Sequence, residues 1–144
     1  MAMEAFLVGG CLCGGVRYEI SGPLGHASHC HCSMCRKHHG AAFGSYASAR
    51  RADFRWTAGE DLVGRFASSP GIERGFCRGC GSTLFWDATG NPESFGLALG
   101  TLDGDPGVRP SLHIFVGSKA LWYEIADDLP AHETSPRAAA AKPA

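Results

Sequence analysis

Short runs in which apolar and polar residues alternate recur along the chain. In the first run, Val16, Tyr18 and Ile20 are separated by Arg17 and Glu19, which is the period of a strand with one buried face. Similar alternation is found at Phe54/Trp56, Leu84/Trp86 and Leu97/Leu99, with turn-forming residues between the runs. The pattern predicts a mostly β fold built from many short strands.

One short stretch carries the signals of a helix. It begins at Ser33, a residue type that often caps helices, continues through His39 and ends at Gly40. Cys35 would lie in the first turn, where the helix dipole favours a thiolate. We therefore expect one or two helical turns immediately after the central cysteines.

The length and charge of the chain limit its class. It has 144 residues, 44% of them hydrophobic, and a formal net charge of −1. This size fits one domain, which we place at residues 1–130, followed by a flexible Ala/Pro-rich tail at residues 131–144. The near-zero net charge disfavours a nucleic-acid partner, and no global field attracts the protein to an anionic membrane.

The first residues lack the features of a secretion signal. Glu4 stands where a signal peptide has basic residues, and the apolar run at residues 5–8 is too short to span a membrane. We therefore expect a cytoplasmic protein without a membrane partner. Because disulfides are rare in a reducing cytosol, its seven cysteines favour metal binding or redox chemistry.

The cysteines form three short clusters with the spacing of metal ligands. Residues two apart on a strand point to the same face, so each Cys-x-Cys pair can direct two sulfurs at one ion. In the Cys-x-x-Cys cluster, Gly79 and Gly81 permit a tight turn whose N–H groups reach coordinated thiolates. The clusters are Cys11/Cys13, Cys30/Cys32/Cys35 and Cys77/Cys80.

The clusters divide into one closed and one open set of ligands. Four sulfurs make the tetrahedral set typical of structural zinc: Cys11, Cys13, Cys77 and Cys80. The other three, Cys30, Cys32 and Cys35, leave one position of a second zinc open, and open positions are where zinc performs chemistry. We expect two Zn²⁺ ions per chain.

The charge of the open set indicates the type of reaction. Three thiolates on a divalent ion leave a formal charge of −1, which makes the ion a poor generator of hydroxide. A soft thiol is the better fourth ligand, so the expected reaction joins a substrate sulfur to an electrophilic carbon, or reverses that addition.

The sequence offers alternative roles for several side chains near Cys30, Cys32 and Cys35. His29 and His31 would point away from the cysteines on a strand, so packing or hydrogen bonding is favoured over direct ligation. The basic stretch at residues 36–39 either faces solvent or contacts the carboxylates of a substrate. Three aromatic residues are interpreted as core rather than pocket lining: Phe43, Tyr46 and Trp86.

Longer motifs resemble a known family. They are GCLCGGVRYE at residues 10–19, HCSMCRK at residues 31–37 and FCRGCG at residues 76–81, with GTLD at residues 100–103 and HIF at residues 113–115 further on. Together with Lys119, Trp122 and residues 128–130, this pattern resembles the glutathione-dependent formaldehyde-activating enzyme family, which also includes centromere protein V. The resemblance covers roughly residues 9 to 130.

The resemblance implies a fold, a metal content and a reaction. The fold is mostly β and tent-like, with structural zinc on Cys11, Cys13, Cys77 and Cys80 and catalytic zinc on Cys30, Cys32 and Cys35. In the enzyme that gives the family its name, glutathione adds to formaldehyde to give S-hydroxymethylglutathione, the reverse of a carbon–sulfur lyase reaction. The implied partners are a small thiol such as glutathione and a small aldehyde.

Two other functions fit the cysteines. In a non-catalytic binding module of the zinc-ribbon kind, all seven sulfurs would be structural. In a thiol redox protein, the metal-free Cys30/Cys32/Cys35 triplet would form and exchange a disulfide. A second zinc with an exchangeable ligand distinguishes the lyase from both.

Overall fold

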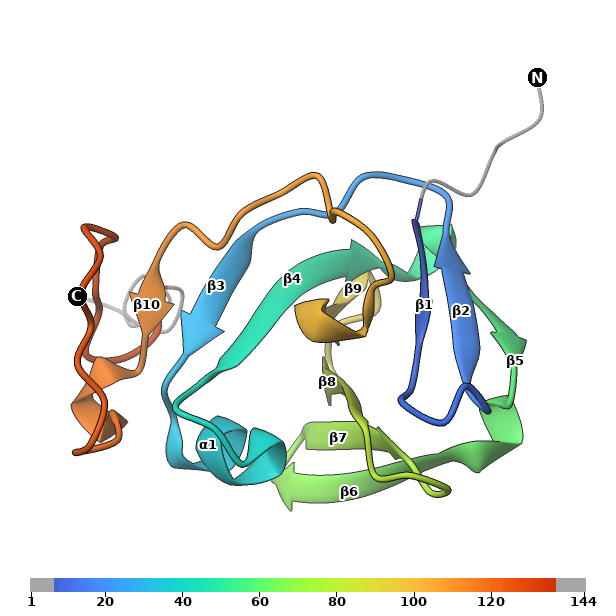
Figure 1. Ribbon diagram of the computed structural model, residues 1–144, viewed down its shortest axis with the longest axis horizontal. Helices are drawn as coiled ribbons and strands as arrows, with labels where there is room; N and C mark the ends of the chain where they lie inside the picture. Colours follow the sequence, from blue (N-terminus) through green and yellow to red (C-terminus); the bar gives the residue numbers. More distant parts are fainter. Residues whose placement is uncertain (1–6, 137–144) are drawn as a thin grey trace.

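The computed structural model describes residues 7–136, which form two β-sheets (Figure 1). A three-stranded sheet has the order β1-β2-β5, and a seven-stranded sheet has the order β10-β3-β4-β9-β8-β7-β6. The strands are β1 (Leu7–Gly10), β2 (Arg17–Ile20), β3 (Ala27–Cys30), β4 (Gly44–Arg50), β5 (Phe54–Ala58), β6 (Val63–Ser69), β7 (Ile72–Cys77), β8 (Thr83–Ala88), β9 (Ser94–Ala98) and β10 (His113–Ile114).

One α-helix and four 3-10 turns connect these strands within residues 7–136. The helix is α1 (Ser33–His39), and the turns are η1 (Arg51–Asp53), η2 (Glu60–Leu62), η3 (Leu99–Thr101) and η4 (Val116–Ser118). All strand pairs are antiparallel except β3 with β10, which is parallel. In Figure 1 the small sheet stands at the right, and the large sheet curves from β10 on the left to β6 at the bottom.

The predicted fold class is confirmed, and the alternating runs become strands. The run at residues 16–20 contains β2, Phe54 and Trp56 lie in β5, and Leu84 and Trp86 lie in β8. Leu97 belongs to β9, but Leu99 starts η3 because the chain bends after Ala98. The predicted helix is also present directly after the central cysteines.

The start of helix α1 differs from the prediction by one residue. The N-cap is Cys32 rather than Ser33, because the Cys32 sulfur accepts a hydrogen bond from the Cys35 N–H at 3.2 Å. Gly40 ends the helix in the left-handed conformation, with φ of 63°, and its N–H bonds to the Arg36 carbonyl. Cys35 lies in the first turn as expected.

Paired backbone extends past the boundary that composition suggested at residue 130. His113 donates its N–H to the Pro130 carbonyl at 2.8 Å and accepts one from His132 at 2.9 Å. Val116 donates to the His132 carbonyl at 3.0 Å. The remainder of the predicted tail, residues 137–144, and the first six residues lie outside the described part of the chain.

No helix within residues 7–136 is both long enough and apolar enough to cross a membrane.

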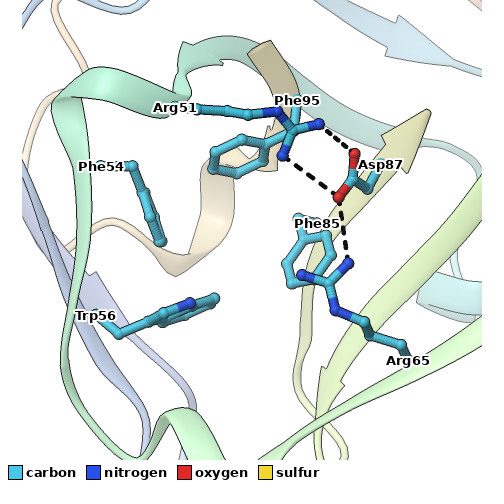
Figure 2. Close-up of a pocket in the computed structure, with 7 residues that line it drawn as sticks. All are labelled: Arg51, Phe54, Trp56, Arg65, Phe85, Asp87 and Phe95. Atoms are coloured by element: carbon cyan, nitrogen blue, oxygen red, sulfur yellow. Dashed lines mark hydrogen bonds and ion pairs between the residues drawn. The ribbon is translucent and has the colours of Figure 1, made fainter. Parts of the chain in front are cut away.

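Aromatic and charged side chains line a crevice between the two sheets (Figure 2). The crevice has a volume of about 100 Å³. Arg51 and Arg65 both bond to the carboxylate of Asp87, which is 7% exposed. The guanidinium groups also lie over rings, Arg65 over Phe85 at 4.8 Å and Arg51 over Phe95 at 5.7 Å.

The strand register explains why this carboxylate needs two arginines. Asp87 on β8 is directly opposite Glu73 on β7, and like charges in that position destabilise a sheet. Arg65 Nη1 bonds to both carboxylates, at 3.2 Å to Asp87 and 3.3 Å to Glu73. The shared guanidinium removes the repulsion and holds β6, β7 and β8 together.

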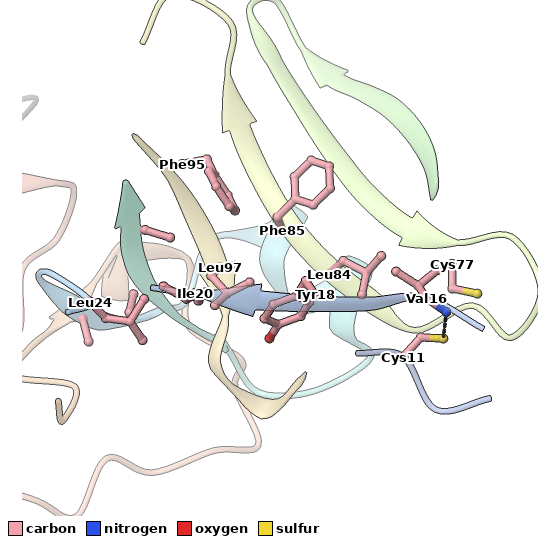
Figure 3. Close-up of a cluster of buried hydrophobic side chains, with 13 residues drawn as sticks. Cys11, Val16, Tyr18, Ile20, Leu24, Cys77, Leu84, Phe85, Phe95 and Leu97 are labelled. Atoms are coloured by element: carbon pink, nitrogen blue, oxygen red, sulfur yellow. Dashed lines mark hydrogen bonds between the residues drawn. The ribbon is translucent and has the colours of Figure 1, made fainter. Parts of the chain in front are cut away.

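The hydrophobic core lies between the sheets (Figure 3). Val16, Tyr18 and Ile20 from the first alternating run are all at most 1% exposed, as are Leu84 and Leu97 on the facing sheet. Each such side chain contributes about 1.5–3 kcal/mol when it leaves water. Cys11 and Cys77 lie at one end of this core, so the core places two sulfurs side by side (Figure 3).

The Asp87 cluster leads to a prediction about stability and pH. The two arginines hold the pKa of Asp87 below its usual value, despite the burial that acts to raise it. A depressed folded-state pKa contributes stability above the unfolded pKa, and this contribution is lost as pH falls through the folded pKa. Asp87→Asn removes these ion pairs and should therefore lower the unfolding free energy at pH 7 by about 2 kcal/mol. The effect is no larger because the arginines are partly exposed to solvent, which screens the charges.

Chemical denaturation between pH 7 and pH 3 tests this expectation. The difference between the native protein and Asp87→Asn should shrink as the pH falls below about 4. Asp105→Asn is the matched control, because Asp105 pairs with Arg109 on the open surface and its amide retains the bond to the Gly107 N–H. An equal effect of the two substitutions at pH 7 would contradict the special role of Asp87.

Candidate metal centre

Four cysteines meet where the two sheets approach each other. Cys11 and Cys13 follow β1 of the small sheet, whereas Cys77 ends β7 of the large sheet and Cys80 lies in the turn before β8. Their four sulfur atoms all lie within 4.8 Å of one another. Residues 66 positions apart in sequence are thus brought to one point, and a metal ion there would join the sheets.

The sulfur spacing fits zinc. Zinc–sulfur bonds of about 2.3 Å in tetrahedral geometry place sulfurs about 3.8 Å apart. The Cys11 and Cys13 sulfurs are 3.5 Å apart, and the Cys13 and Cys77 sulfurs are 3.9 Å apart. All four ligands are thiolate-forming sulfur atoms, the donor set of a closed structural zinc site.

Backbone N–H groups point at these sulfurs, as the glycine pattern predicted. Gly79 donates to Cys77 Sγ at 3.3 Å, Gly15 to Cys13 Sγ at 3.4 Å and Val16 to Cys11 Sγ at 3.2 Å. Such hydrogen bonds stabilise the negative charge of thiolates. Gly81 has a φ of 81°, which a residue with a side chain rarely adopts, so the turn at Cys80 needs a glycine.

The first cysteine pair converges differently from the expectation. Cys11 and Cys13 lie in a turn after β1, closed by the Gly14 N–H and the Cys11 carbonyl, and not along a strand. Their sulfurs still lie close together because this hydrogen-bonded turn reverses the direction of the chain between them. The strand geometry expected for this pair is therefore wrong, although the two sulfurs do lie close together, 3.5 Å apart.

Ser82 connects the two halves of the four-sulfur cluster and was missed by the sequence analysis. Its hydroxyl accepts the Leu12 N–H at 2.8 Å and lies 3.2 Å from Cys80 Sγ. The Ser82 hydroxyl is the main cause that lowers the pKa of Cys80 to about 5. A small polar residue directly after Cys-x-x-Cys-Gly is the only sequence signal for this role.

The other three cysteines meet at the N-terminus of helix α1. Cys30 ends β3, Cys32 is the N-cap of the helix and Cys35 lies in its first turn. Their sulfurs also lie within 4.8 Å of one another. This arrangement, which we call the triplet, offers three thiolate ligands, one fewer than the closed zinc geometry requires.

The triplet is shielded by the core of the large sheet. Cys30 and Cys35 are 7% and 2% exposed, while Cys32 is half-buried. Hydrogen bonds from the Cys30 and Cys35 thiols hold the pKa of Cys32 far below its usual value, and the neighbouring Cys32 and Cys35 sulfurs raise the pKa of Cys30.

Two of the three aromatic residues assigned to the core pack against the triplet. Tyr46 is 4% exposed, and both Tyr46 and Trp86 belong to the cluster of side chains around Cys30 and Cys35. Phe43 lies instead against the rings of His29 and His31, at centroid distances of 4.4 and 5.0 Å. It is half-buried and lines a cavity beside helix α1, so the expectation that it is core and not pocket lining is wrong.

The two histidines beside the triplet form bonds elsewhere. His29 Nδ1 bonds to Ser45 Oγ at 2.8 Å, and His31 Nε2 bonds to His113 Nδ1 at 2.7 Å. His113 Nε2 continues the chain of bonds to the Asp127 carboxylate at 3.0 Å. Neither His29 nor His31 joins the sulfur groups that could hold a metal, in agreement with a packing role.

The basic stretch at residues 36–39 divides between solvent and protein contacts. Lys37 is exposed, and Arg36 bonds to the Ser118 carbonyl at 3.0 Å. His39 Nε2 bonds to the Tyr46 hydroxyl at 2.6 Å, and burial lowers the pKa of His39 to about 4. At neutral pH the histidine next to the triplet is therefore uncharged.

A cavity of about 620 Å³ opens between the end of helix α1 and the four-sulfur cluster. Its lining includes His38 and His39 from the helix, Cys11 and Ser82 from the cluster, and the loop at residues 100–103. Its volume is that of a small-molecule site. The lining is rich in hydroxyl and imidazole groups, so it suits a polar ligand.

The fold and its two sulfur clusters define a small β domain with two groups of cysteines that could hold metal ions, one of four sulfurs and one of three. The sequence model of the glutathione-dependent formaldehyde-activating enzyme family matches residues 6–118. The chain belongs to this family, which confirms the resemblance found in its motifs.

Individual relatives agree with this assignment. The chain is 30% identical over 127 residues to a putative glutathione-dependent formaldehyde-activating enzyme of Halomonas elongata, covering 83% of this chain and 80% of that protein. It is 24% identical over 119 residues to an uncharacterized lyase of Schizosaccharomyces pombe, covering 83% and 85%. A crystal structure of a Rhodobacter sphaeroides protein matches with a TM-score of 0.58 and 30% identity over 68% of this chain and 89% of that chain.

The two sulfur clusters should respond differently to substitution. Cys80→Ser removes one of the four sulfurs that meet between the sheets, and a structural zinc held by them would contribute about 10 kcal/mol or more to folding, so this variant should unfold. Cys32→Ser should leave the fold nearly intact, because serine is a good N-cap and can accept the same Cys35 N–H. Circular dichroism and denaturant titration of both variants measure the difference, and equal unfolding of the two would contradict the division.

Proposed function

We propose that the protein is a zinc-dependent carbon–sulfur lyase that joins a small thiol, such as glutathione, to formaldehyde or a related small aldehyde. One observation carries the proposal: three cysteine sulfurs meet at the buried end of a helix, one ligand short of a closed site. Membership of the family and the lyase named among the relatives support the reaction class.

The proposed metal sites follow the two sulfur clusters. Cys11, Cys13, Cys77 and Cys80 would hold a structural Zn²⁺, and Cys30, Cys32 and Cys35 would hold a catalytic Zn²⁺. When bound by the triplet, zinc supplies an open position that keeps a substrate thiol in its thiolate form at neutral pH. Because such thiols must stay reduced, we also propose a cytoplasmic location.

The protein groups around the triplet would protect the reacting sulfur from water. Tyr46 and Trp86 pack against the cysteines and leave Cys32 the most accessible of the three sulfurs. A less hydrated thiolate is a stronger nucleophile toward a carbonyl carbon. The aromatic residues would therefore act by excluding water from the triplet rather than by binding the metal.

The bond changes of the proposed reaction are simple. The substrate sulfur forms a bond to the aldehyde carbon, the carbonyl π-bond breaks, and its oxygen takes up the proton that the thiol has lost. No oxidant or reductant is needed, and the reverse sequence cleaves the carbon–sulfur bond.

The cavity beside helix α1 would receive the rest of the thiol substrate. His38 and His39 form part of the cavity wall, and they lie on the same helix as Cys35. Ser45, Ser82 and Thr101 line the cavity, and although their hydroxyls already bond to protein groups, each oxygen keeps capacity to accept a further bond from the N–H groups of a peptide-like thiol.

An assay with ¹³C-formaldehyde and glutathione tests the proposal. The zinc-loaded protein should accelerate formation of the S-hydroxymethyl adduct, which is detected by its carbon NMR signal. Exchange spectroscopy is suitable because it reports the rate at equilibrium. Cys32→Ser should lose at least 90% of the acceleration, roughly the minimum expected when a catalytic group is removed.

A panel of thiols completes the experiment. Glutathione, cysteine and 2-mercaptoethanol distinguish a site that needs a peptide-like substrate from one that accepts any thiol. Native protein that holds one inert zinc ion and accelerates none of these additions would overturn the proposal, and would favour the non-catalytic binding module.

A further inference from the structure

A buried arginine reaches the triplet from strand β7. Arg74 is 6% exposed, and its Nη1 donates a hydrogen bond to Cys35 Sγ at 3.2 Å. Its Nε donates to Ser68 Oγ at 3.2 Å, which fixes the plane of the guanidinium. The ion pairs found within residues 7–136 do not include Arg74. The cysteine sulfurs are therefore the anionic partner that this arginine contacts.

The strand order places this guanidinium at the metal centre. Arg74 is opposite Trp86 on β8 and opposite Phe66 on β6. Trp86 itself packs against the triplet, so Arg74 and Trp86 approach the sulfurs side by side from neighbouring strands. Side chains alternate along a strand, so Glu73 and Gly75 belong to the other face of the sheet.

Other cations near the triplet do not replace Arg74. Arg36 bonds to a backbone carbonyl, and Lys37 is exposed. Burial lowers the pKa of His38 and of His39, so both rings are neutral at pH 7. The guanidinium of Arg74 stays protonated at any physiological pH.

The energetics of burial explain what this charge does. An arginine removed from water is costly unless an anion accepts its hydrogen bonds. A divalent ion with three thiolates has a formal charge of −1, and a fourth thiolate makes the charge −2. A fixed positive charge beside Cys35 therefore stabilises the four-sulfur form more than the form with water in the open position.

We infer that Arg74 is a positioning residue that balances the charge of the triplet and makes its open position prefer an anionic sulfur to water. The inference rests on the proposed function, because it assumes that the triplet binds zinc. It adds a specificity determinant, contributed by β7, to a site whose ligands come from the end of β3 and from the N-cap and first turn of α1. The selected substrate group is a thiolate rather than a hydroxyl or a carboxylic acid.

Metal competition on the purified protein tests this role without relying on activity. The zinc affinity of the more labile site is measured with a chromophoric chelator, first alone and then at increasing glutathione. Arg74→Met keeps the length of the side chain but removes its charge and its hydrogen bonds. It should lower the zinc affinity of the labile site about tenfold or more, because a charge-assisted hydrogen bond is lost. The affinity of that site for glutathione should fall further.

Two further variants separate charge from structure. Arg74→Lys keeps the charge without the planar fork and should recover part of the loss. Arg36 is adjacent to Cys35 in sequence, but its guanidinium bonds to the Ser118 carbonyl. Arg36→Met should therefore change the zinc affinity of the labile site less than about twofold. The tightly held zinc of the four-sulfur cluster reports in every sample that the protein is folded.

Each outcome bears on a different claim. Arg74→Met with the native zinc affinity and the native glutathione response would overturn the role of Arg74. Native protein without a second, labile zinc would instead overturn the proposed function. If Arg74→Met loses the tight zinc and does not fold, Arg74→Gln, which still donates N–H bonds but carries no charge, provides the same comparison with the same criteria.

Discussion

The convergence of four cysteine sulfurs from both sheets is the constraint on which the rest of this structure depends. Cys11 and Cys13 come from the small sheet, and Cys77 and Cys80 come from the large one. The core between the sheets is built largely from short strands far apart in sequence, so their association has a high entropic cost. A metal ion bound at this junction would offset that cost, and backbone N–H groups with the Ser82 hydroxyl favour thiolates there.

The second sulfur cluster uses the same chemistry in a different setting. In the four-sulfur cluster Cys11 and Cys77 are buried and Cys13 is open to solvent, whereas in the triplet Cys30 and Cys35 are buried against Tyr46 and Trp86. The first cluster has a full set of ligands, and the second has three sulfurs and a neighbouring guanidinium. A stable metal clip needs saturation, while a reactive site needs an open position and a charge environment that selects what enters it. In the proposed function, one ligand and one arginine thus separate the structural cluster from the reactive one.

Much of this arrangement could be predicted from local sequence, because short spacing determines local geometry. The three short cysteine clusters, the strand at residues 17–20 and the helix ending at Gly40 all follow from neighbouring residues, and the grouping of Cys11/Cys13 with Cys77/Cys80 follows from the four ligands that structural zinc requires. The contacts that tune the sites could not be predicted, since Arg74 is 39 positions from Cys35 and Ser82 is 70 from Leu12. The helix cap moved to Cys32 because its sulfur, and not the Ser33 hydroxyl, accepts the Cys35 N–H. The pairing of His132 with His113 likewise depends on backbone bonds that composition does not reveal.

Zinc-edge X-ray absorption on protein of known zinc content, with and without glutathione, tests the central claim most directly. The account predicts two zinc ions per chain with an average of about 3.5 sulfur ligands each, rising to about 4 when the thiol enters the open position. One zinc ion per chain, with four sulfur ligands before and after addition of glutathione, would contradict it.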